Sequence, residues 1–109
     1  MGRMYILDAQ GEPEPCDDVM RWSEWFERDE RRIVRQQTFP TPLGKDASVS
    51  TVFLGLDHGW QGGLKPLLWE TMCWLGGEAL DAQWRYRSRE DAIEGHNRVV
   101  AEWGGPVLE

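Results

Sequence analysis

Asp57 and His58 are the residues of this chain whose types and spacing most suggest chemistry. A carboxylate beside an imidazole can carry out general acid–base catalysis or bind a metal ion. With His96, the only other histidine, they would suffice for a small acid–base or metal-dependent enzyme. However, adjacent residues of a regular strand point to opposite faces of the sheet. The alternative is therefore a strand end, where Asp57 accepts backbone N–H bonds of the following turn and His58 lies at the surface.

The other side chains that could bind a metal ion do not strengthen this enzyme hypothesis. His96 belongs to an apolar stripe at helical spacing, where a neutral, hydrogen-bonded histidine of the core is the common case. Cys16 and Cys73 are the only cysteines and have no CxxC spacing, so neither a zinc site nor a disulfide framework is indicated. We therefore predict no catalytic residue, no metal and no cofactor.

The elements that must position these residues follow from hydrophobic periodicity. Alternation and β-branched or aromatic content predict strands, 3.6-residue periodicity predicts helices, and prolines and glycines mark the loops between them. The predicted strands cover residues 5–7, 33–39, 49–56, 67–74 and 82–86, and the predicted helices cover residues 19–29 and 89–103. Asp17 or Asp18 is suited to cap the first helix, and Ser88 the second.

This order predicts one α+β domain over residues 1–109. Its core architecture is an antiparallel sheet of three to four strands, with the two amphipathic helices packed on one face. The length of 109 residues suits a single hydrophobic core.

The chain holds seven tryptophans, more than one small core needs. Trp60 lies in a glycine-rich connection. Trp69 and Trp74 lie on opposite faces of one predicted strand, so one of them must point away from the helices. Exposed aromatic residues are enriched at protein interfaces. We therefore take Trp60, Trp69 and Trp74, with Asp57 and His58, as the candidate interface residues.

The charge distribution excludes some partners. Twelve basic and nineteen acidic side chains give a formal charge of −7, which repels a phosphate backbone and disfavours direct nucleic-acid binding. The same charge favours a basic protein surface, including one that itself binds nucleic acid. No stretch approaches the roughly 18 apolar residues of a membrane helix, and the N-terminus lacks a secretory signal pattern, so we expect a cytoplasmic protein and no membrane partner.

Several segments together resemble one protein family. They are "MYILDAQGEPEPC", "RWSEWFERDERRIVR", "VSTVFLGLDHGW", "LLWETMCW" and "RYRSREDAIEGH", in this order along the chain. In these segments the chain resembles a family of small accessory proteins encoded by tailed bacteriophages and prophages. It departs from the family in the loops "TFPTPLGKDAS" and "QGGLKPLLW". The resemblance implies a setting in the cytoplasm of a bacterial host and carries over no catalytic residue.

Together these observations predict an acidic phage accessory protein that binds and modulates or inhibits a host or defence protein. Occupation of that partner's nucleic-acid-binding site is one way in which it would act. The alternative remains the small metal-dependent or acid–base enzyme that uses Asp57, His58 and His96. We also expect a homodimer through the sheet face that bears Trp69 or Trp74, because two helices cover only one face of a sheet.

Overall fold

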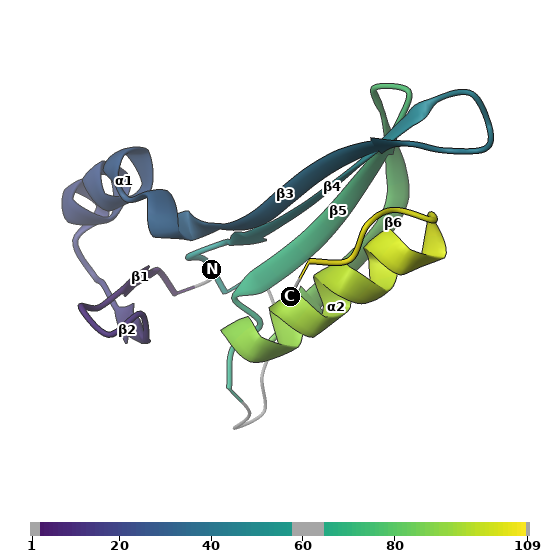
Figure 1. The fold of residues 1–109 in the computed structure, drawn as a ribbon. Coiled ribbons are helices and arrows are strands. Elements are labelled where there is room, and N and C mark those ends of the chain that lie inside the picture. The colour runs from purple at the N-terminus through teal and green to yellow at the C-terminus, as the bar shows by residue number, and fades with distance from the viewer. Residues whose placement is uncertain (1–2, 58–64, 109) are drawn as a thin grey trace.

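The computed structural model describes residues 3–57 and 65–108. Within these ranges the centre of the fold is a four-stranded antiparallel sheet with a long helix across one face (Figure 1). The strands lie in the order in which they occur along the chain, β3 (Ile33–Pro40), β4 (Asp46–Phe53), β5 (Trp69–Leu75) and β6 (Glu78–Tyr86). The predicted α+β class is confirmed, and the sheet is a meander, because strands that follow one another along the chain lie side by side.

The helix α2 (Arg89–Glu102) packs along the sheet as its apolar stripe predicts. Ser88 caps it, since its hydroxyl accepts the Asp91 N–H at 3.0 Å. The buried face of the helix meets every second residue of the strands. This contact forms one hydrophobic cluster made of Phe39, Ala47, Val49, Cys73, Val99 and Val100, with Leu75, Leu80, Trp84 and Trp103 around it.

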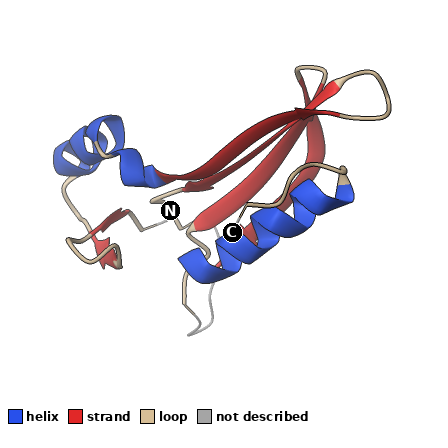
Figure 2. Ribbon diagram, in the orientation of Figure 1, coloured by secondary structure: helices blue, strands red, loops and turns tan. Residues whose placement is uncertain are grey.

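A small N-terminal unit lies at one end of the sheet (Figure 2). It contains a hairpin of β1 (Tyr5–Leu7) and β2 (Pro13–Pro15), the helix α1 (Val19–Arg28) and the 3₁₀ turn η1 (Glu30–Arg32). The carbonyl of Gly55 connects this unit to the end of β4. It accepts the Tyr5 N–H at 2.7 Å and the Trp22 Nε1–H at 3.0 Å.

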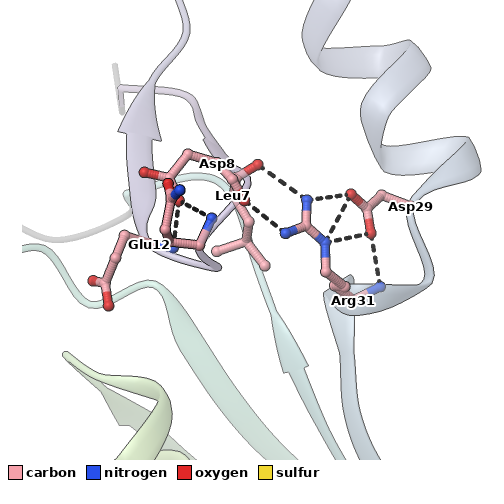
Figure 3. A network of polar contacts seen from close by, with 6 residues as sticks. Leu7, Asp8, Glu12, Asp29 and Arg31 are labelled. Atoms are coloured by element: carbon pink, nitrogen blue, oxygen red, sulfur yellow. Dashed lines mark hydrogen bonds and ion pairs between the residues drawn. The ribbon is translucent and has the colours of Figure 1, made fainter.

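Arg31 ties the hairpin to the α1–β3 connection (Figure 3). Its guanidinium donates to both carboxylate oxygens of Asp29 and to the backbone carbonyls of Leu7 and Asp8. The hydrogen bonds from Arg31 hold the pKa of the Asp29 carboxyl below its usual value. Bidentate arginine–carboxylate pairs are among the most directional polar contacts, so this cluster fixes the orientation of the hairpin.

A second hydrophobic cluster joins the N-terminal unit to the sheet. Phe53, at the end of β4, contacts the rings of Trp25 and Phe26 from α1 and of Trp69 from β5. Phe53 is on the same face as α2, so both helices use one face of the sheet. They do so unequally, because α2 lies along the sheet and contacts all four strands, whereas α1 reaches only one end of the sheet (Figure 1). Neither described helix is long and apolar enough to cross a membrane.

Several strand boundaries differ from the sequence prediction, among them the start of β4 at Asp46 and the start of β5 at Trp69. The strand expected over residues 49–56 ends at Phe53, because Gly55 adopts a φ of +68° that a regular strand does not allow. The strand expected from residue 82 begins at Glu78. Gly76 and Gly77 have φ values of +59° and +84°, which make a tight two-residue hairpin turn. Residues 13–15, expected only to be extended, pair with β1.

The assignment of Asp18 as the N-cap of α1 can be tested by mutation. Asp17 and Asp18 are both exposed, but it is the Asp18 carboxylate that caps the helix, accepting the N–H groups of Met20 and Arg21 at 3.0 and 3.3 Å. We expect Asp18→Ala to lower the free energy of unfolding by about 1 kcal/mol, the usual loss on removing an N-cap. Asp17→Ala is the matched control and should change it by less than about 0.5 kcal/mol. Urea unfolding measures both, and equal losses would contradict the assignment.

Candidate functional site

Strand β5 carries two of the candidate interface tryptophans, Trp69 and Trp74, on opposite faces of the sheet. Trp69 is 3% exposed and belongs to the cluster around Phe53. It is therefore a core residue in this fold, and not an interface residue. Trp74 lies five positions later, on the other face, and is half-buried. Of this pair, Trp74 is the tryptophan that points away from the helices.

The face that carries Trp74 is not covered by either described helix, and we call it the open face. Pairing across the strands defines its residues, because partners in an antiparallel sheet share a face. They include Gln36, Thr38, Asp46, Ser48, Ser50, Val52, Glu70, Met72, Trp74, Ala79, Gln83 and Arg85.

Short polar side chains occupy the β3 and β4 part of the open face. Thr38 and Ser48 are hydrogen-bonded through their hydroxyls at 2.9 Å, and Gln36 donates to the Ser50 hydroxyl at 3.1 Å. Ser48 is paired with Trp74 in the neighbouring strand, and Ser50 with Met72. The two large apolar side chains thus lie on an inner strand beside groups that can donate and accept hydrogen bonds.

Charge on the open face is sparse and placed at its margins. Glu70 and Arg85 pair with each other at 3.0 Å. Asp46 and Asp81 are exposed and lie on the two strands that flank Trp74, each two residues from its cross-strand partner. We call these two carboxylates the acidic rim. This combination of an aromatic centre, few charges and a polar margin is typical of protein–protein interfaces.

His96 lies in the core, on the opposite side of the sheet. It is 0% exposed, its Nδ1 is 2.7 Å from the Thr51 hydroxyl, and its Nε2 is 2.7 Å from the Gln37 side-chain oxygen. Burial, reinforced by the positive charge of Arg35, lowers the pKa of His96 to about 4. The ring is therefore neutral at pH 7, as expected for a core histidine.

The partners of His96 fix the direction of a longer chain of hydrogen bonds. The Gln37 oxygen can only accept, so His96 carries its proton on Nε2 and its Nδ1 must accept from Thr51. Thr51 then accepts from Thr71 at 2.6 Å, and Thr71 accepts from the Tyr86 hydroxyl at 3.1 Å. Both ring nitrogens are thus occupied, which leaves neither for a metal ion or for Asp57.

Asp57 lies just after β4, in a short stretch of the chain that pairs with the N-terminal segment. Its N–H donates to the carbonyl of Arg3 at 3.0 Å, next to the pairing of Met4 with Leu56. The side chain of Asp57 is half-buried. His58 and Trp60, which the sequence analysis placed in the same site, lie outside the described residues.

The cysteines are separate and buried. Cys16 is 2% exposed and Cys73 1% exposed, and each is a free thiol. Burial raises the pKa of the Cys73 thiol, which disfavours the reactive thiolate. In residues 3–57 and 65–108 no three histidine, cysteine or carboxylate side chains are grouped so as to hold a metal ion.

The chain of buried hydroxyls that ends at His96 was not predicted from the sequence. Thr51 and Thr71 are both 0% exposed, and each occupies an inward position of its strand, where apolar residues are expected. Polar residues at inward positions of adjacent strands are the one signal that could have indicated a buried hydrogen-bond chain.

Comparison with models of protein families, with curated proteins and with solved structures finds no match for this chain.

Proposed function

We propose that this chain is a protein-binding module that docks through the open face onto a basic surface of a bacterial host or defence protein. The observation that carries the proposal is the position of Trp74 and Met72 on an inner strand of a face that neither described helix covers, between the carboxylates of the acidic rim. Partly exposed aromatic residues at the centre of a patch supply most of the binding energy at interfaces. The acidic rim adds attraction for a partner of opposite charge.

A basic partner fits this face better than a second copy of the chain does. Two copies would each carry a net charge of −7 and would bring their acidic rims together. Opposed like charges oppose association. A basic partner gains from the same groups, and a nucleic-acid-binding site is one basic surface of this kind. Its occupation would make the chain an inhibitor, in agreement with the phage setting that the resemblance implies.

The test uses one substitution on the open face and one elsewhere. We expect Trp74→Arg to abolish retention of the partner from a bacterial lysate, because it removes the aromatic anchor and adds a charge that a basic surface repels. Met20→Arg is the matched control, since Met20 is 69% exposed on α1 and the same charge is added there. It should retain the partner. Circular dichroism checks that both variants are folded.

Two further measurements make the outcome decisive. Substitution of the acidic rim by Asp46→Asn and Asp81→Asn should weaken retention most at low salt, because screening removes the rim's contribution at high salt. Loss of the partner with Met20→Arg but not with Trp74→Arg would overturn the proposal. So would a wild-type dimer in analytical ultracentrifugation that Trp74→Arg abolishes, since it would assign the open face to a second copy.

A further inference from the structure

A cavity of about 390 Å³ opens where three distant parts of the chain meet. The β1–β2 hairpin contributes Tyr5 and Pro13, the segment before β5 contributes Lys65 and Pro66, and the start of α2 contributes the rest of the polar wall. This volume is within the range of small-molecule sites. The cavity is on the helix side of the sheet, so it is independent of the open face.

Hydrogen-bond donors dominate the polar wall of this cavity. Lys65, Arg87 and Arg89 all line it, in a chain whose overall charge is −7. The Arg87 Nε donates to the carbonyl of Lys65 at 2.9 Å, which orients the guanidinium and leaves its terminal nitrogens for another acceptor. Glu12 and Glu90 also line the cavity, but among the described residues neither forms a salt bridge with these three cations.

Two further donors come from the backbone at the start of α2. The cavity contains the first residues of α2, a helix of 14 residues, and the Ser88 hydroxyl accepts only the Asp91 N–H. The N–H groups of Arg89 and Glu90 therefore have no partner within the helix. Trp69 also lines the cavity, and its buried Nε1–H has no acceptor among the described residues.

We propose that this cavity binds a small phosphomonoester that carries a flat ring. Helix N-terminal N–H groups and arginine side chains are the usual ligands of phosphate oxygens in proteins. The half-buried Tyr5, Pro13 and Pro66 provide an apolar wall for the ring. An inorganic anion would contact the hydrogen-bond donors alone, whereas a phosphomonoester with a ring would contact both the donors and the apolar wall.

Adenosine 5′-monophosphate is a suitable probe, with adenosine and inorganic phosphate as its two halves. In ¹⁵N-labelled protein we expect saturable shifts, upon addition of the monophosphate, of the Trp69 indole N–H and of the Arg89 and Glu90 amides. Each half alone should bind at least about tenfold more weakly, because it forgoes either the charge-assisted hydrogen bonds or the apolar contact.

Matched variants locate the site. Arg89→Gln should weaken binding of the monophosphate about tenfold. Arg98→Gln removes an exposed arginine further along the same helix and should leave it within about twofold. Trp74→Arg should also leave it unchanged, which separates this site from the open face. Absence of saturable shifts, equal binding of either half alone, or unchanged binding by Arg89→Gln would each overturn the proposal.

Discussion

Phe53→Ala is expected to lower the free energy of unfolding by about 3 to 5 kcal/mol, the usual loss for a large aromatic residue of a core. Phe53 is 1% exposed, and its ring lies 5.7 Å from that of Trp25 and 5.2 Å from that of Trp69. It thus holds α1 and β5 together. A loss of this size is a large part of the stability of a small domain, and urea unfolding would measure it.

Val52→Ala is the matched control because Val52 is the neighbouring residue, on the open face, and only half-buried. We expect it to cost about 1 kcal/mol or less, since its side chain is not enclosed by the core. If the two variants lost equal stability, the cluster around Phe53 would not be what attaches the N-terminal unit. Burial of alternate side chains in β4 would then make no difference to their contribution to the free energy of unfolding.

Local patterns were sufficient to predict most of the fold. The amphipathic stripe of α2 and its Ser88 cap could be identified because both depend on neighbours within one helical turn. The alternation in β5 correctly separated Trp69 from Trp74, although only the position of α2 showed which of them is buried. The strand ends could not be placed as well, because the end of β4 depends on a contact between Gly55 and the distant Tyr5 and Trp22.

The candidate site depends more strongly on tertiary structure, so the sequence predicted less of it. The interface hypothesis needed only one strand, and for Trp74 it stays a prediction. The enzyme hypothesis needed residues of different elements to converge. Instead His96 is enclosed by Thr51 and Gln37, partners that come from two strands and could not be paired with it before the register was known. The cavity at the start of α2 was missed for the same reason, since three separate segments build it.

The buried state of His96 has a consequence for stability at low pH. The pKa of His96 is about 4 in the folded protein, below its ordinary value of 6.5. Between these two values the unfolded chain binds a proton that the folded protein does not, so folding loses stability as the pH falls. The contribution of His96 is complete above about pH 6.5 and is lost progressively down to about pH 4, with a total of about 3 kcal/mol.

The hydrogen bonds of His96 explain why its protonation destabilises the folded protein. A proton on Nδ1 of His96 turns an acceptor into a donor, so the Thr51 hydroxyl can no longer donate to the ring and the buried hydrogen bonds of Thr51 and Thr71 must rearrange. Protonation also places a buried positive charge near Arg35. The unfolding free energy should therefore fall steeply between pH 6.5 and 4 in chemical denaturation. Loss of the Asp29–Arg31 pair follows only at lower pH, since the pKa of Asp29 is itself lowered.

His96→Gln tests this origin through the slope of stability against pH, whatever its effect on stability at pH 7. We expect it to flatten the fall between pH 6.5 and 4, because the group that takes up the proton is gone. His58→Gln removes the other histidine and is the matched control. A wild-type curve without this fall would refute the prediction, and so would a fall that persists in His96→Gln or vanishes in His58→Gln. Either of the last two results would mean that the proton taken up on unfolding binds elsewhere than at the buried ring.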